Sequence, residues 1–307
     1  MNAGKEFTRK YIGIMFSQLR DANDEQVAEE IEHCRRENRK PVRVPRKHRP
    51  HFSEETFQAQ NGFTMQVFRH GEEKNDRLII YLAGGAFVYQ PVFFHWRFVY
   101  DLALRSHSDA VIPIYPKAPD YHCQFSIETL LEWYENVINN YKYKEINIIG
   151  DSAGGNISLT LAMEIAHRHL KDYANLILLS PCLDLSYQHE AEMRALQPLD
   201  TMIQLDRIIT LTDLWRGDLS QGHPWASPLF GDLNCVHDLY TYYGTNEILK
   251  VDNDLLEEKC DKLGIPIHSN SYDGMFHTFP LFPIPQAFDA IRKMAIILKN
   301  KSQNRKH

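Results

Sequence analysis

The stretch EINIIGDSAGGNISLTLAM, residues 145–163, decides the fold that this sequence predicts. It opens with a short apolar run containing Ile146, Ile148 and Ile149, as expected of a strand buried on both faces. It closes with a nearly all-apolar segment that predicts a buried helix. Between the two lies Gly-Asp-Ser-Ala-Gly, residues 150–154. A strand, a tight serine turn and a helix in this order predict that the Ser152 hydroxyl is exposed at the end of the strand, where it can act as a nucleophile.

The glycines beside Ser152 have a physical role in this prediction. Gly150 and Gly154 lack a Cβ, so neighbouring backbones can come close to the turn. The helix that follows then points its N-terminus at the serine, and its free N–H groups and dipole favour a negative charge there. The alternative is a glycine-rich turn that serves packing only.

Other short apolar runs predict a sheet around this strand. Near-continuous apolar strands that alternate with helices are typical of a parallel sheet covered on both faces. The sequence therefore predicts the α/β class, with a mostly parallel sheet flanked by helices. The expected strands are residues 62–70, 77–82, 110–115, 145–150 and 175–180, with weaker candidates at 238–243 and 265–272, and the clearest helical patterns are residues 127–138, 157–166 and 287–298.

The segments outside this alternation predict the domain organisation. Residues 1–50 are expected to form two helices, one over Phe7 to Leu19 and one from Asn23, followed by a proline-broken basic linker. The basic residues 39–49 are interpreted as a solvated linker, with a contact for an anionic surface as the alternative. Residues 186–225 have poor strand signals and predict an insertion over the sheet. The core is then residues 51–185 and 226–300, and residues 301–307 form a polar tail.

Composition excludes several classes of protein. The chain has 307 residues and a net charge of −6, which argues against a nucleic-acid binder. No apolar run is long enough for a membrane span. The N-terminal residues lack the continuous apolar stretch of a secretory signal, and the five cysteines are widely spaced, which together predict reduced thiols in the cytoplasm.

Four segments carry a family resemblance. They are Ala83-Gly84-Gly85-Ala86-Phe87, Tyr-Pro-Lys-Ala-Pro-Asp at 115–120, Gly-Asp-Ser-Ala-Gly-Gly at 150–155 and Ser-Pro-Cys-Leu-Asp-Leu at 180–185. Together they resemble the hormone-sensitive-lipase-like esterases of the α/β-hydrolase fold, over roughly residues 79–279. The resemblance implies a helical cap made of residues 1–50 and 186–225. It also implies hydrolysis of carboxylic esters by a serine nucleophile.

The same resemblance implies which backbone groups stabilise the oxyanion. The N–H groups of Gly84, Gly85 and Ala153 would donate to it. The family usually has histidine where this chain has Ala83, so the shape of the glycine loop is a departure. Candidates for lining the substrate pocket are Phe87, Met275, Phe276, Trp215 and Trp225, although core packing is an equal alternative for each.

A serine nucleophile needs a base and an acid that orients the base. In this fold the order along the chain is serine, acid, histidine. His277 lies between the last expected strand and the last helix, where the fold places its base. Glu247 in Gly-Thr-Asn-Glu-Ile-Leu, residues 244–249, resembles the family's Gly-x-x-Asp-x-Leu, and Asp252 is the rival acid. His167 and His169 fall on a helix and are expected to be solvated or packed.

These residues predict a serine carboxylic-ester hydrolase that acts through an acyl-enzyme on small or short-chain esters. Its expected partner is a small-molecule ester, with a homodimer as an open possibility. No metal-binding motif or dinucleotide fingerprint stands out, so we expect neither a metal nor another cofactor. The alternatives are a catalytically silent protein that binds a small ligand on the same fold, and an amidase or peptidase.

Overall fold

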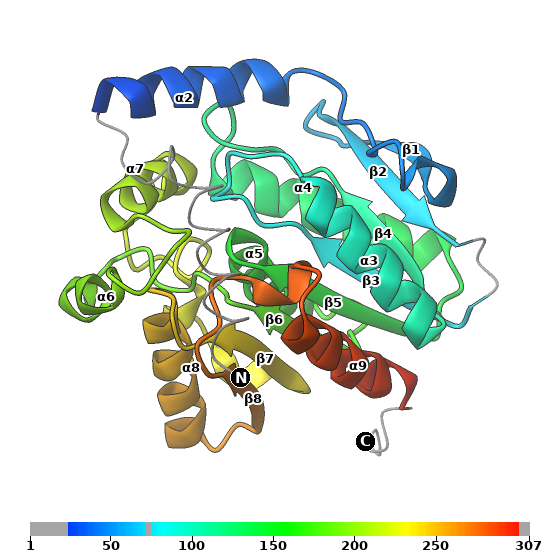
Figure 1. Ribbon diagram of the computed structural model, residues 1–307. Helices are drawn as coiled ribbons and strands as arrows, with labels where there is room; N and C mark the ends of the chain where they lie inside the picture. The colour runs from blue at the N-terminus through cyan, green and yellow to red at the C-terminus, as the bar shows by residue number, and fades with distance from the viewer. Residues whose placement is uncertain (1–23, 72–74, 301–307) are drawn as a thin grey trace.

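The computed structural model describes residues 24–71 and 75–300, which contain one eight-stranded sheet (Figure 1). The strand order is β1-β2-β4-β3-β5-β6-β7-β8. The neighbours from β4 to β8 run parallel, whereas β1 and β2 are antiparallel additions at one edge. This confirms the predicted mostly parallel sheet. The strands are β1 (Ser53–Gln58), β2 (Thr64–His70), β3 (Arg77–Leu82), β4 (Asp109–Pro113), β5 (Glu145–Asp151), β6 (Asn175–Leu179), β7 (Leu239–Gly244) and β8 (Ile267–Tyr272).

Alternating residues of each central strand enter two separate hydrophobic cores. In β3, Leu78 and Ile80 belong to one core, and Ile79 and Tyr81 belong to the other, because successive side chains of a strand point to opposite faces. Both sets are apolar, which is why these strands read as continuous apolar runs. Helices α4 (Cys123–Asn140), α5 (Ala153–His167) and α8 (Lys250–Leu263) cover the first face, and α3 (Phe93–Ser106) and α9 (Pro285–Lys299) cover the second (Figure 1).

Strand β1 and helices α3 and α8 are among the elements that were not predicted from the sequence. Strand β1 is mostly exposed and polar, so it lacks the apolar run that marks a strand. Helix α3 buries one face at helical spacing, for example Phe98, Leu102 and Ser106, but this pattern was not recognised among its aromatic residues. Helix α8 is rich in charged residues. The helix predicted over Phe7 to Leu19 and the tail 301–307 lie outside the described residues.

The segments predicted to form a cap meet at one end of the sheet. Helix α2 (Asp24–Asn38) belongs to the first segment, and α6 (Glu190–Leu196) and α7 (Leu205–Arg216) belong to residues 186–225. Arg207 of α7 forms an ion pair with Glu30 of α2, and both contact the Tyr89 hydroxyl. Figure 1 shows α2 and α7 at the same end of the molecule. Among the helices of residues 24–71 and 75–300, none is long and apolar enough to cross a membrane.

The turn between β5 and α5 packs backbone against backbone. Strands β3 and β5 pair with Leu82 opposite Gly150, so the end of β3 lies beside the start of α5. A Cβ on Gly154 would collide with the carbonyl oxygen of Leu82, and one on Gly150 would collide with the carbonyl oxygen of Gly154. Glycine at these two positions is therefore required for the helix to start directly behind the strand.

We expect Gly154→Ala to destabilise the protein by about 2 kcal/mol or more, because a methyl group has no room against the Leu82 backbone. Urea unfolding followed by circular dichroism measures the change. Gly222→Ala is the matched control, since its Cβ would meet nothing nearer than the Phe230 ring at 3.9 Å, and we expect a change within about 0.5 kcal/mol. Equal stability of the two variants would contradict this account of the turn.

Candidate active site

Ser152 occupies the turn between β5 and α5 in a strained conformation. Its φ is 53° and its ψ is −120°, in a region that residues with a side chain rarely adopt. Its N–H donates to the carbonyl of Leu179 at 2.8 Å, and its own carbonyl accepts from Cys182 N–H at 3.2 Å. These bonds to β6 and the loop after it hold the turn in place. The side chain lines a cavity of about 880 Å³.

His277 and Glu247 form a buried hydrogen-bonded pair. The distance from His277 Nδ1 to Glu247 Oε2 is 2.6 Å, and both residues are buried. Glu247 follows β7 and His277 follows β8, and these parallel neighbours end at the same edge of the sheet as β5. With Nδ1–H donating to the carboxylate, Nε2 remains as the proton acceptor. His277 lines the same cavity as Ser152.

The Glu247 carboxylate is fully buried, and its other oxygen is also hydrogen-bonded. Oε1 accepts from the Ser180 hydroxyl at 2.7 Å and from Gly244 N–H at 2.8 Å. The Ser180 oxygen in turn accepts from Thr278 N–H at 3.0 Å, beside His277. Ser180 therefore links the acid to the base, although the sequence analysis did not single it out. The sequence feature that could have pointed to Ser180 is its position as the first residue of the segment 180–185, which carries part of the family resemblance.

The environment of His277 favours its charged form. Burial alone would lower the pKa of the imidazole, but the hydrogen bond and negative charge of Glu247 outweigh it and raise the pKa above its ordinary value of 6.5. The carboxylates of Asp200 and Asp151 act in the same direction. Glu247 thus stabilises the imidazolium that forms when His277 accepts a proton.

Asp252, the rival acid, has different partners. Its carboxyl oxygen accepts from Leu183 N–H at 2.5 Å and from Asp184 N–H at 3.2 Å. Burial raises its pKa to about 8, so the group is largely protonated at neutral pH and carries little charge to stabilise an imidazolium. The geometry therefore favours Glu247 as the acid and makes Asp252 a brace for the loop after β6.

The glycine loop after β3 requires a correction to the predicted oxyanion donors. Gly84 N–H donates to Asp151 Oδ1 at 2.9 Å, and Gly84 does not line the cavity, so its N–H is not available to a substrate. Gly85 and Ala86 do line the cavity, and both have a positive φ, 123° and 49°. Ala153 opens α5, where the first N–H groups have no acceptor within the helix. Gly85 and Ala86 therefore replace Gly84 as candidate donors. Ala153 stays a candidate because it is the first residue of α5, although it does not itself line the cavity.

The Asp151 carboxylate holds the glycine loop in position by hydrogen bonding. Besides Gly84, its carboxylate accepts from the Tyr81 hydroxyl at 2.5 Å and lies 3.4 Å from His95 Nε2. His95 Nδ1 accepts from Val92 N–H at 2.9 Å, which leaves the ring proton on Nε2, facing Asp151. Burial opposes the charge of Asp151, but these partners keep the carboxyl pKa below its ordinary value. No sequence motif pointed to His95, because it lies within α3, which was not predicted.

The cavity walls differ from those predicted. Phe87 stacks on Trp215 with ring centroids 4.5 Å apart, and Phe276 packs against Phe282 in the core. None of Phe87, Met275, Phe276, Trp215 and Trp225 lines this cavity. The contacts of Phe87 and Phe276 fit the core-packing alternative. The two predicted cap segments supply much of the wall instead. Their lining residues are His33, Cys34, Glu37, Asn38, Lys40, Pro41, Val42 and Arg43 from the first segment, and Met202, Ile203, Gln204, Arg207, Ile208 and Leu211 from the second.

Comparison with known proteins shows which family the chain belongs to. A model of the alpha/beta hydrolase fold family matches residues 79–281, which is about two thirds of the chain. The chain belongs to this α/β-hydrolase family. An esterase of Acinetobacter venetianus is 30% identical over 227 residues, covering 71% of this chain and 73% of the relative. An acetyl-hydrolase of Streptomyces hygroscopicus is 22% identical over 213 residues, covering 67% and 69%.

Solved structures agree with this membership. A candidate esterase from Staphylococcus aureus superimposes with a TM-score of 0.84 at 26% identity, covering 91% of this α/β-hydrolase and 94% of that chain. An esterase from the bacterial hormone-sensitive lipase family has a TM-score of 0.79 at 19% identity, covering 98% and 99%. The second likeness is one of fold. Together with the family match and the related esterase, these structures confirm the predicted α/β-hydrolase fold and the resemblance to esterases.

We expect the His277 imidazole to titrate above pH 6.5, because Glu247 stabilises its charged form. A pH titration of the histidine signals by NMR measures this, with the His277 signal assigned by its loss in His277→Gln. Glu247→Gln should lower the midpoint, since a neutral amide removes the negative charge. Asp252→Asn is the matched control and should leave the midpoint in place. A shift in the Asp252 variant without one in the Glu247 variant would reverse the assignment of the acid.

Proposed function

We propose that this α/β-hydrolase is a serine carboxylesterase that acts on small or short-chain esters through an acyl-enzyme. The observation that carries the proposal is the shared cavity. Ser152 and His277 both line it, and His277 is held by Glu247 at 2.6 Å. The esterase and acetyl-hydrolase among its relatives support the same reaction class.

The first half of the reaction forms the acyl-enzyme. Ser152 Oγ attacks the ester carbonyl carbon while His277 Nε2 takes the hydroxyl proton. Glu247 holds the imidazole in the required tautomer and balances its positive charge. His277 then gives the proton to the leaving alkoxide, and the alcohol departs. In the second half, water attacks the acyl carbon along the same route, and the carboxylic acid leaves Ser152 free.

The negative charge of each tetrahedral intermediate develops on the former carbonyl oxygen. We assign the stabilisation of this negative charge to the N–H groups of Gly85, Ala86 and Ala153. Loss of one such donor costs roughly 10²–10³-fold in turnover in serine hydrolases. Backbone donors of this kind need no cofactor, and the chain's own residues account for every proton transfer.

The proposed substrate class follows from the cavity. A volume of about 880 Å³ accommodates a small ester, and aliphatic side chains such as Val88, Ile208 and Leu281 among its lining favour an apolar acyl or alcohol group. We propose that the two cap segments close over this group, because they supply much of the wall. Closure excludes water and strengthens the hydrogen bonds to the oxyanion.

Location and assembly remain proposals that rest on the sequence. The five cysteines are free thiols, which supports the proposed cytoplasmic location. A homodimer is proposed through β8, which forms one edge of the sheet. Light scattering of the purified protein tests the dimer.

We expect Ser152→Ala to lower turnover of p-nitrophenyl acetate by roughly 10³-fold or more, because no other group replaces the nucleophile. Wild-type protein should also gain the mass of one serine-directed phosphonate at Ser152. Ser53→Ala, on β1 and outside the cavity lining, is the control and should keep full activity.

Two results would redirect the proposal. Wild-type protein that hydrolyses no ester or amide and takes up no phosphonate would favour the silent ligand-binding protein. Faster turnover of amides than of esters with the same acyl group, lost in Ser152→Ala, would favour an amidase or peptidase.

A further inference from the structure

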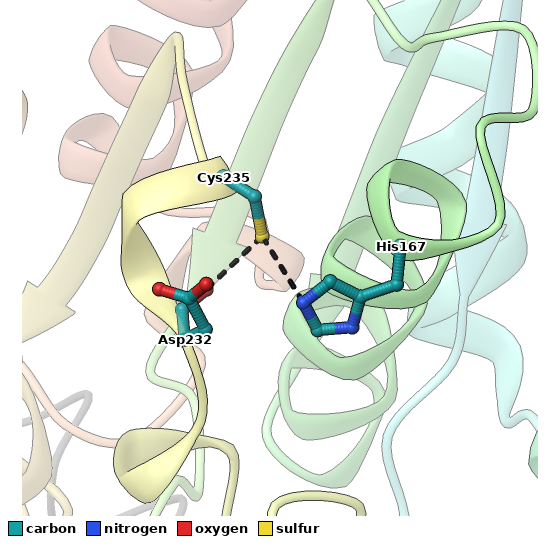
Figure 2. A group of neighbouring side chains, drawn as sticks. All are labelled: His167, Asp232 and Cys235. Atoms are coloured by element: carbon teal, nitrogen blue, oxygen red, sulfur yellow. Dashed lines mark hydrogen bonds between the residues drawn. The ribbon is translucent and has the colours of Figure 1, made fainter.

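Three side chains with metal-binding chemistry meet far from the catalytic cavity. His167 ends α5, and Asp232 and Cys235 lie at the 3₁₀ helix η3 (Leu233–Cys235) (Figure 2). One donor atom from each side chain lies within 4.8 Å of the other two. None of the three lines the cavity that holds Ser152 and His277. Their chemistry is therefore not used in the proposed ester hydrolysis.

The two ring nitrogens of His167 face different partners. His167 Nε2 lies 4.0 Å from Cys235 Sγ, while its Nδ1 faces Glu164 Oε1 at 3.5 Å (Figure 2 shows the first contact). Glu164 is itself held by the indole N–H of Trp225 at 2.9 Å. Metal-bound histidines commonly direct the second ring nitrogen to a carboxylate, which fixes the ring and makes it a stronger ligand.

The other two side chains are positioned by local structure. One carboxylate oxygen of Asp232 accepts from Asn234 N–H at 3.0 Å and from the Asn234 amide at 2.8 Å. This cap on η3 fixes the carboxylate beside Cys235. The nearby Lys259 ammonium donates to the carbonyls of Leu229 and Gly231, at 2.6 and 2.9 Å, and so is directed at backbone oxygens.

We propose that His167, Asp232 and Cys235 form a zinc site. Imidazole nitrogen, thiolate sulfur and carboxylate oxygen are the three donor types that Zn²⁺ takes, and three protein ligands leave a fourth position for water. Ligand atoms around tetrahedral zinc lie about 3.3–3.6 Å apart, given metal–ligand distances of about 2.0–2.3 Å. The donor atoms are up to 4.8 Å apart, so the most widely separated pair has to approach by roughly 1 Å when the metal binds. Two of the three side chains are exposed and the cysteine is half-buried.

Binding replaces one interaction of the cysteine. The Cys235 thiol donates to the backbone carbonyl of Asp232 at 3.0 Å. On zinc binding the thiol loses its proton to solvent, the sulfur–zinc bond forms, and the hydrogen bond to the carbonyl is lost. The metal then joins the C-terminal end of α5 to the segment before β7. Because Ser152 directly precedes α5, the site would stabilise the helix that follows the nucleophile without entering the reaction.

Cobalt substitution tests the site directly in the full chain after treatment with EDTA. Co²⁺ should bind with one equivalent per chain and give a thiolate-to-cobalt charge-transfer band, and Zn²⁺ should displace it and raise the unfolding temperature. Cys235→Ser should abolish the band, and His167→Gln and Asp232→Asn should weaken binding by about tenfold or more. Glu164→Gln should weaken it by about tenfold through the histidine alone.

His169→Gln is the matched control, since His169 is also exposed at the end of α5 and should not affect binding. Circular dichroism checks that each variant is folded. Absence of saturable binding, or equal Zn²⁺ affinity in wild type and the Cys235 and His167 variants, would overturn the proposal. Because the readouts are spectroscopic and thermal, failure here leaves the proposed esterase activity untouched.

Discussion

The contact of Gly154 with the backbone of Leu82 is the constraint on which the rest of the site depends. It brings the end of β3 against the first turn of α5, so that the loop after β3 and the helix N-terminus lie on either side of Ser152. The cost is a strained φ of 53° at the serine, which the hydrogen bonds to Leu179 and Cys182 offset. One close backbone approach therefore positions the nucleophile together with the groups proposed to stabilise its oxyanion.

Two buried carboxylates hold the other parts of the site in position. Glu247 holds the base through His277 Nδ1, and Asp151 holds the loop through Gly84 N–H. A buried charge is tolerated only when hydrogen bonds replace its water, and each carboxylate has at least three such partners. At Ala83, where the family resemblance implies a histidine, the backbone carbonyl accepts from the Tyr115 hydroxyl at 2.9 Å. The loop is held by the Tyr115 hydroxyl and by Asp151, which in turn contacts His95, and it needs no histidine at position 83.

Prediction from sequence succeeded where a short stretch of residues determines its own local structure. The run at 145–149 forms β5 because both of its faces are buried, and the spacing of Gly150, Ser152 and Gly154 forms the turn because only glycine fits there. It failed where packing decides. Strand β1 exists because it pairs with β2, and Phe87 turns away from the cavity because it stacks on Trp215. The residues next to each of these contacts in the sequence carry no pattern that predicts it.

The sequence by itself determined the α/β class and the serine turn, because these follow from periodicity and from chemistry over short spans. Its family resemblance suggested Glu247 and His277 as the acid and the base. Only the tertiary structure decided that Ala86 and not Gly84 faces the cavity, because that depends on which N–H group Asp151 takes. It also brought His167 beside Cys235, 68 residues away, since two elements on the same face of the sheet meet there. Contacts between distant segments are made by packing, and no local pattern encodes them.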